Sequence, residues 1–129
     1  MAYVRFQADV LRRVGARIFS AVGAPAETAR IVAGDLVTAN LMGHDSHGML
    51  RLPQYVRAVR QGGVDATARP RVVSVRGATA LVSGDWAFGQ LTGRAGMDEA
   101  VRLAGEHGVG MVAAVRCAHL GRLGEFVER

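Results

Sequence analysis

Residues 43–56 read GHDSHGMLRLPQYV and are the most informative stretch of this chain. Two imidazoles, a hydroxyl, a carboxylate and a guanidinium stand between Gly43 and Arg51, behind an apolar helical pattern. Histidine is the side chain whose protonation changes nearest neutral pH, and arginine holds a carboxylate through two parallel charge-assisted hydrogen bonds. This combination favours a site for a small keto or hydroxy acid.

Reduction of a 2-oxo acid needs a group that holds the carboxylate, a group that protonates the carbonyl oxygen, and a cofactor that carries hydride. Arg51 and His47 can meet the first two needs. His119 is a third candidate, because it follows an apolar run and precedes Gly121, a setting typical of functional loops. For each of these side chains, a structural or solvent-exposed position is the alternative interpretation. Cys117 is predicted to be a small buried apolar residue and not a nucleophile.

Two helices are predicted before this stretch. Residues 3–22 carry apolar side chains at every fourth position, which predicts one buried stripe, and residues 25–42 show a second apolar face. Pro53 disfavours helical angles at Leu52, so residues 47–61 are predicted to form either a kinked helix or a turn that leads into a shorter one. The stripe and the second face comprise Val10, Val14, Ile18 and Val22, and Ala29, Val32, Ala33, Leu36, Val37 and Asn40.

The second half of the chain predicts a sheet. Residues 71–75 and 79–84 are rich in Val and Ala and predict a hairpin that turns at Gly77. Residues 89–106 return to helical spacing, and the continuous apolar run over 109–115 predicts a buried strand.

This order predicts an α+β architecture. An N-terminal helical segment would occupy residues 1–63, and residues 64–129 would begin a catalytic portion with a sheet. Gly108 and Gly110 precede a strand and open no helix, so they do not form the glycine fingerprint of a Rossmann dinucleotide site.

Composition restricts the class of protein. Half of the 129 residues are hydrophobic, which argues against disorder. The pI is near 10.9, but all 16 basic residues are arginines scattered along the chain without a dense cluster, so no nucleic-acid partner is predicted. A single cysteine favours the reducing cytoplasm, and no apolar run is long enough to predict a membrane span.

Two other functions stay open at this stage. His44, Asp45, His47 and His119 are possible metal ligands, which would suit a metal-dependent hydrolase. No CxxC or HExxH spacing is present, so no metal is predicted. A non-catalytic interaction domain is the other alternative.

The stretch 43–56, together with residues 84–126 (GDWAFGQLTGRAGMDEAVRLAGEHGVGMVAAVRCAHLGRLGEF), resembles the malate/L-lactate dehydrogenase family of non-Rossmann, NAD(P)-dependent oxidoreductases. This group includes ureidoglycolate and sulfolactate dehydrogenases and diketogulonate reductase. The resemblance covers nearly the whole chain. Its most specific part is Ser46-His47-Gly48, followed by Arg51 and Tyr55.

The resemblance implies a role for each candidate. His47 would exchange a proton with the substrate oxygen, with Ser46 beside it, and Arg51 would hold the substrate carboxylate. His119 would line the same pocket, against the substrate or the nicotinamide. The cofactor would be NAD or NADP, and the substrate a small 2-oxo or 2-hydroxy acid.

The resemblance also implies a mixed, mostly antiparallel sheet with packed helices, and a cytoplasmic homodimer. Family members continue far beyond this length. The chain is therefore expected to be an N-terminal part, inactive alone, with most of the cofactor-binding surface outside it.

Overall fold

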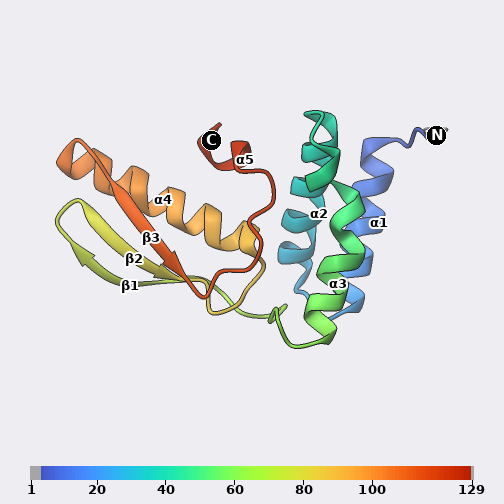
Figure 1. The fold of residues 1–129 in the computed structure, drawn as a ribbon, viewed down its shortest axis with the longest axis horizontal. Helices are drawn as coiled ribbons and strands as arrows, with labels where there is room; N and C mark the ends of the chain where they lie inside the picture. The colour runs from blue at the N-terminus through green and yellow to red at the C-terminus, as the bar shows by residue number, and fades with distance from the viewer. Residues whose placement is uncertain (1–3, 129) are drawn as a thin grey trace.

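A computed structural model describes residues 4–128. Helices α1 (Ala8–Ala21), α2 (Ala26–Leu41) and α3 (Leu52–Arg60) lie together at one end of the molecule, as Figure 1 shows. The sheet and helix α4 (Gly89–His107) lie at the other end, and the short helix α5 (Gly124–Val127) follows near the C-terminus. The α+β architecture predicted from the sequence is confirmed.

Helices α1 and α2 form where the apolar spacing predicts them, but the buried side of α1 differs from the prediction. Val10 and Val14 are 40% and 44% exposed, whereas Gly15 and Phe19 are buried. The reason is a close approach between the two helices: a Cβ on Gly15 would lie 3.0 Å from Cβ of Ala33 on α2. Small residues therefore decide which side of α1 turns inward, and a count of large apolar residues misses this.

The apolar face predicted for α2 is confirmed. Ala29, Val32, Ala33, Leu36 and Val37 are all buried.

Three aromatic rings connect the helical end of the molecule to the sheet end. Phe19 of α1 lies 6.4 Å from Tyr55 of α3 and 5.5 Å from Phe88, which precedes α4, measured between ring centroids. Tyr55 and Phe88 are 6.3 Å apart. A second link is ionic, because Arg94 of α4 lies 2.5 Å from Asp35 of α2. The aromatic cluster and the ion pair both join residues before position 63 to residues after it. The domain boundary at residue 63 stays a prediction.

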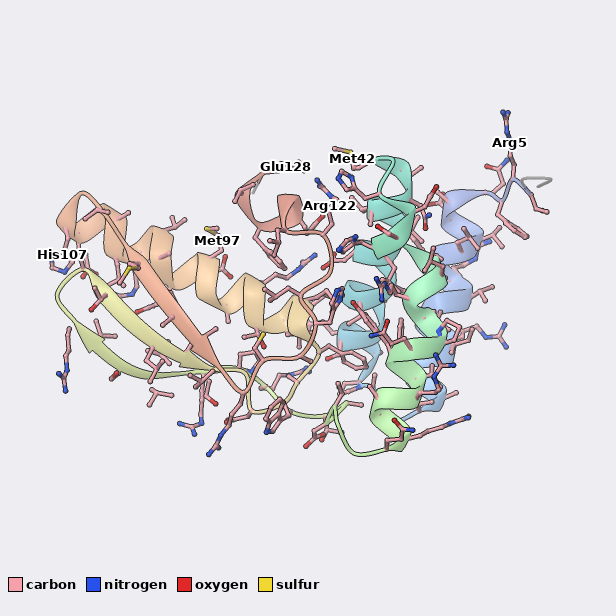
Figure 2. The ribbon with its side chains drawn as sticks, in the orientation of Figure 1. Arg5, Met42, Met97, His107, Arg122 and Glu128 are labelled. Atoms are coloured by element: carbon pink, nitrogen blue, oxygen red, sulfur yellow. The ribbon has the colours of Figure 1, made fainter. Side chains whose placement is uncertain are left out.

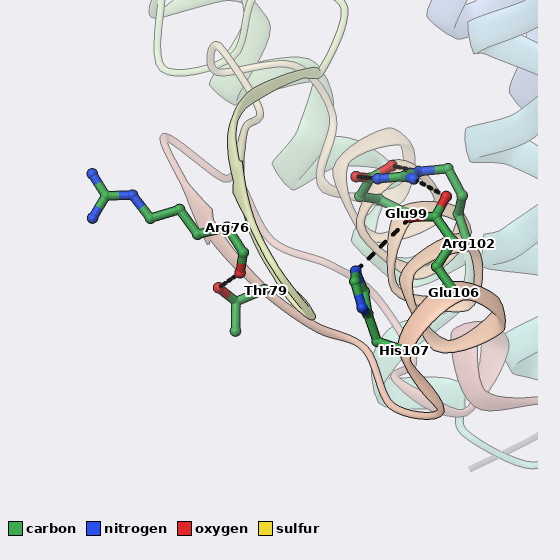
Figure 3. A network of polar contacts seen from close by, with 6 residues as sticks. All are labelled: Arg76, Thr79, Glu99, Arg102, Glu106 and His107. Atoms are coloured by element: carbon green, nitrogen blue, oxygen red, sulfur yellow. Dashed lines mark hydrogen bonds and ion pairs between the residues drawn. The ribbon is translucent and has the colours of Figure 1, made fainter.

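The sheet has three strands in the order β1 (Arg71–Arg76), β2 (Thr79–Ser83) and β3 (Met111–Val115). Strands β1 and β2 are antiparallel and form the predicted hairpin, while β2 and β3 are parallel, so the sheet is mixed. At the hairpin turn, the Thr79 hydroxyl donates to the carbonyl oxygen of Arg76 over 2.9 Å (Figure 3).

The prediction that residues 109–115 form a buried strand is wrong in its burial. Strand β3 forms, but Met111 is 64% exposed and Val115 is 43% exposed. Helix α4 packs against the sheet, yet β3 is an edge strand, and within residues 4–128 no other strand pairs with its outer side. A continuous apolar run predicts that both faces of a strand are buried, and here the other elements cover β3 only in part.

The C-terminal end of α4 carries an exposed ion-pair group. Arg102 lies 2.6 Å from both Glu99 and Glu106, and His107 Nε2 lies 3.9 Å from Glu106 (Figure 3). Exposed pairs of this kind contribute little to stability. His107 lies far from α1–α3, as Figure 2 shows, and its position at a helix C-terminus suits the helix dipole.

Candidate active site

The histidine-rich stretch forms two short 3-10 turns between α2 and α3, η1 (Asp45–His47) and η2 (Met49–Arg51). Of the two predicted possibilities, the turn leading into a shorter helix is therefore correct. Gly48 separates the two turns with extended backbone angles, φ −90° and ψ −153°. The predicted effect of Pro53 on Leu52 is wrong: Leu52 has helical angles, φ −53° and ψ −46°, and begins α3. Pro53 stands in the first turn of this helix, where its missing N–H is not needed.

Asn40 anchors this loop to α2. Its Oδ1 accepts the backbone N–H of Met49 over 2.8 Å, and its Nδ2 donates to Asp45 over 2.5 Å. The Asn40 side chain also fills the space beside Gly48, where a Cβ would collide with it. The sequence placed Asn40 only on an apolar helix face, so its role as an anchor was missed.

We expect Gly48→Ala to lower the free energy of unfolding by about 1–3 kcal/mol, the usual range for overpacking, because the new methyl group displaces the Asn40 side chain. Urea denaturation of the chain measures this. Gly34→Ala is the matched control: no atom lies within 4 Å of its added Cβ, and Gly34 is inside α2. The control is expected to stabilise the chain by about 0.5–1 kcal/mol. Equal stability of the two variants would contradict this account of the loop.

The structure brings His47 and His119 together, although 72 positions separate them in the sequence. Their rings stack with centroids 5.6 Å apart and an interplanar angle of 26°. His47 is half-buried, and its Nδ1 lies 2.9 Å from the hydroxyl oxygen of Ser46, within hydrogen-bond distance. The structure therefore places Ser46, His47 and His119 side by side, while their roles stay predictions.

Arg51 lies beside this pair and is partly engaged by its own loop. Its Nε donates to the carbonyl oxygen of Ser46 over 2.6 Å, and its Nη1 donates to Oε1 of Gln54 over 2.7 Å. Within residues 4–128, Nη2 makes no hydrogen bond. The outer edge of the guanidinium, with Nη2 and the second N–H of Nη1, is thus open to an anionic ligand.

His119 is held by hydrogen bonds that involve two helices, α3 and α4, and the loop after His119 itself. Its Nδ1 lies 2.8 Å from the hydroxyl of Tyr55, which in turn accepts from Nε2 of Gln90 over 3.1 Å. The backbone N–H of Gly121 donates to the same Nδ1 over 3.2 Å. Tyr55 and Gln90 are buried, whereas His119 is exposed.

These surroundings shift two pKa values. Partial burial lowers the pKa of His119, and the positive charge of Arg51 and the neighbouring His47 lower it further. His119 is thereby favoured in its neutral form. Burial raises the pKa of Tyr55, more than the hydrogen bond from Gln90 lowers it, so the phenol keeps its proton.

A cavity of about 170 Å³ lies on one side of His119. Tyr55, Phe88 and His119 contribute its aromatic lining, with Gln54, Ala58, Gly63, Val64, Gly89 and Ala118 completing the wall. His47 and Arg51 do not line this cavity. The candidate site therefore has two parts: an open surface formed by His47, Arg51 and the exposed ring of His119, and the cavity on the other side of His119.

The other sequence candidates take structural positions. His44 is exposed with Nδ1 3.1 Å from the carbonyl oxygen of Met42, and Asp45 is held by Asn40. The Cys117 thiol donates to the carbonyl oxygen of Ala118, and burial raises its pKa, which disfavours the nucleophilic thiolate.

Neither a metal centre nor a membrane span is found in the described part of the chain. Within residues 4–128, no three His, Cys, Asp or Glu side chains come together as a metal-ion site. Over the same residues, no helix is long and apolar enough to cross a bilayer.

The sequence missed Gln90 altogether and placed Tyr55 only on a short apolar helix face and in the motif of the resemblance. Helix α4 carries several charged and polar residues, so no sequence signal marked Gln90 as buried. No local pattern could pair Tyr55 with a histidine 64 positions away.

Comparison with known proteins places these features in a family. The family model described as malate/L-lactate dehydrogenase matches residues 6–129. Hydroxycarboxylate dehydrogenase B of Escherichia coli K12 is 36% identical over 125 residues, which is 97% of this chain and 35% of that protein.

Solved structures agree with the sequence match. The malate dehydrogenase of Pyrococcus horikoshii superposes with a TM-score of 0.90 at 37% identity, covering 96% of this chain and 36% of that one. The sulfolactate dehydrogenase of Methanocaldococcus jannaschii gives 0.90 at 33% identity, covering 95% and 36%. The chain thus spans about a third of the length of the relatives it matches.

Proposed function

Because the chain belongs to the malate/L-lactate dehydrogenase family, we propose that it forms one side of an active site that transfers hydride between NAD(P)H and a small 2-oxo or 2-hydroxy acid. The observation that carries this proposal is the stacked pair of His47 and His119, with the open edge of Arg51 beside it. This arrangement combines a proton-exchanging imidazole with a guanidinium fork that suits a carboxylate.

In this proposal Arg51 binds the substrate carboxylate through its outer N–H groups. This contact fixes the orientation of the adjacent carbonyl carbon, and such positioning lowers the barrier of the chemical step. During reduction His47 gives a proton to the carbonyl oxygen as hydride reaches the carbon, so a 2-oxo acid, one hydride and one proton become a 2-hydroxy acid. In the reverse direction neutral His47 takes the hydroxyl proton.

Bound NAD(P)H would supply the hydride in this chemistry. The cavity beside His119 fits part of such a cofactor: a cavity of about 150 Å³ in another protein holds a benzene ring, so about 170 Å³ suffices for one six-membered ring but not for a dinucleotide. Tyr55, Phe88 and His119 would therefore contact the nicotinamide end. We assign the remaining cofactor contacts to parts of the family fold that these 129 residues do not include.

A chimaeric enzyme tests the proposal. Residues 6–129 of this chain would replace the matching segment of the Pyrococcus horikoshii malate dehydrogenase. We expect the chimaera to oxidise NADH or NADPH in the presence of oxaloacetate, pyruvate or sulfopyruvate, the 2-oxo counterparts of the acids named in the relatives. A folded chimaera without turnover on any of these acids would overturn the proposal.

Arg51→Lys in the chimaera is expected to raise KM for the 2-oxo acid about ten- to hundredfold, the effect of losing one hydrogen bond to a charged group. Lysine keeps the charge but loses the planar fork, so kcat should change less than KM. Arg57→Lys, an exposed position on α3, is the matched control and should leave KM unchanged. Equal KM values for Arg51→Lys and the parent chimaera would remove Arg51 from carboxylate binding.

We extend the proposal to the assembly and location that the family resemblance implies, a homodimer in the cytoplasm. The single cysteine of the 129 residues suits a reducing compartment.

A further inference from the structure

We propose that His119 is fixed as a neutral imidazole with its proton on Nε2, and that Tyr55 and Gln90 are the positioning residues that fix it. His119 then serves the site as a hydrogen-bond donor and not as a second base. This inference rests on the proposed function for the identity of the acceptor, which is an oxygen of the 2-oxo acid. The tautomer itself is a property of the ligand-free chain.

The backbone of Gly121 decides which ring nitrogen carries the proton. An amide N–H can only donate, and it points at Nδ1 of His119 over 3.2 Å. A proton on Nδ1 would face this N–H directly, so Nδ1 must present its lone pair. Gly121 reaches this position with φ +83°, and a Cβ there would lie 3.1 Å from Nε2 of Gln90.

Tyr55 strengthens the same choice. Its hydroxyl lies 2.8 Å from Nδ1, the shorter of the two contacts to that atom. Gln90 Nε2 donates to the hydroxyl oxygen over 3.1 Å, so the phenol accepts from Gln90 and its own proton is free to point at the Nδ1 lone pair that Gly121 selects. Both side chains are buried, Tyr55 at 5% and Gln90 at 1% relative exposure, so the hydrogen bond between them is shielded from water.

The other nitrogen of His119 is left for a ligand. Within residues 4–128, Nε2 has no hydrogen-bond partner, and the ring is exposed and stacked on His47. The charged and titratable groups around it are His47, Arg51 and Tyr55, with Asp35 acting on Tyr55 from α2. The two imidazoles are therefore not equivalent: Nδ1 of His119 is occupied and its Nε2 donates, so proton exchange falls to His47.

Nitrogen-15 NMR of the histidine rings of the unmodified 129-residue chain, at mildly alkaline pH, tests the tautomer directly. The chain has four histidines, and a His119→Asn variant assigns the His119 signals by their disappearance. We expect an unprotonated Nδ1 and a protonated Nε2 for His119. A protonated Nδ1 would overturn the proposal without the need for any further variant.

Two near-isosteric variants test the positioning residues. Tyr55→Phe removes one hydrogen bond to Nδ1, so the ratio of the Nε2–H form to the Nδ1–H form at His119 is expected to fall about two- to tenfold. Gln90→Met is expected to lower the ratio in the same direction by a smaller factor. His44 and His107 are internal controls, and their signals should not move. An unchanged ratio in a folded Tyr55→Phe chain would remove Tyr55 from the positioning role.

The readout separates this inference from the proposed function. The NMR experiment contains no substrate and no cofactor, so a failed chimaera does not alter its outcome. In an active chimaera, Tyr55→Phe is expected to lower kcat with little change in KM for the cofactor, and Tyr55→Trp, which cannot donate to Nδ1 in the same geometry, should not rescue it. An unaltered kcat beside a changed tautomer ratio would show that the donor has no part in turnover and would contradict the role given to His119.

Discussion

Replacing His47 by alanine is expected to lower kcat of the chimaeric enzyme by about 10²- to 10⁴-fold, the usual contribution of a positioned general acid or base. The reason is the assignment of proton exchange to this residue alone. His119 cannot substitute for it if its Nδ1 is occupied by Tyr55 and Gly121. Steady-state NAD(P)H oxidation with a 2-oxo acid measures the loss, and cofactor binding, followed by nicotinamide fluorescence, should be retained.

His44→Ala provides the matched control for this experiment. It makes the same substitution in the same loop, three positions away. The His44 side chain is exposed, and within residues 4–128 its one hydrogen-bond partner is the carbonyl oxygen of Met42. We expect its kcat to equal that of the parent chimaera. Comparable losses in both variants would mean that the loop conformation, and not the His47 imidazole, limits turnover.

The parts of the fold that local spacing controls could be predicted. Helices α1 and α2, the hairpin turning at Gly77, and α4 all form within a few residues of their predicted bounds. Each depends on contacts between residues close in sequence, since helical periodicity and turn chemistry act over a few positions. The apolar spacing also supported a helical end followed by a sheet.

The candidate site could be predicted only in part. His47, Arg51 and His119 were singled out by residue type and position, and the structure brings His47 and His119 to within 5.6 Å. What holds them was not predictable, because Tyr55 reaches His119 across 64 positions and Asn40 reaches Met49 across nine. Such contacts depend on how helices pack, and no periodicity encodes that.

Burial was the least predictable property. The apolar positions Val10 and Val14 of α1, and Met111 and Val115 of β3, are exposed within the described residues. In α1, Gly15 redirects the packing, and in β3 the strand stands at an edge of the sheet. An apolar side chain makes burial favourable, but burial also needs a second part of the structure that packs over that side chain.

Phe19→Ala is expected to lower the free energy of unfolding of the chain by about 3–5 kcal/mol, the usual cost of removing a fully buried phenylalanine ring. Phe19 has 0% relative exposure and contacts the rings of both Tyr55 and Phe88. Since small domains are stable by only about 5–15 kcal/mol, this single change takes a large share of the total. Urea denaturation followed by circular dichroism measures it.

Phe6→Ala is the matched control, because Phe6 is 65% exposed and its removal should change stability by less than about 0.5 kcal/mol. Similar losses from both variants would contradict the contacts described for the aromatic core.

The Phe19 ring also packs against the Tyr55 ring, so removal of the Phe19 ring frees the Tyr55 ring to move away from His119. Phe19→Leu, which keeps most of the buried volume, should therefore retain more of the Nε2–H form of His119 than Phe19→Ala does. The same substitution series thus connects core packing, measured by unfolding, to the protonation pattern of the site, measured by the imidazole signals.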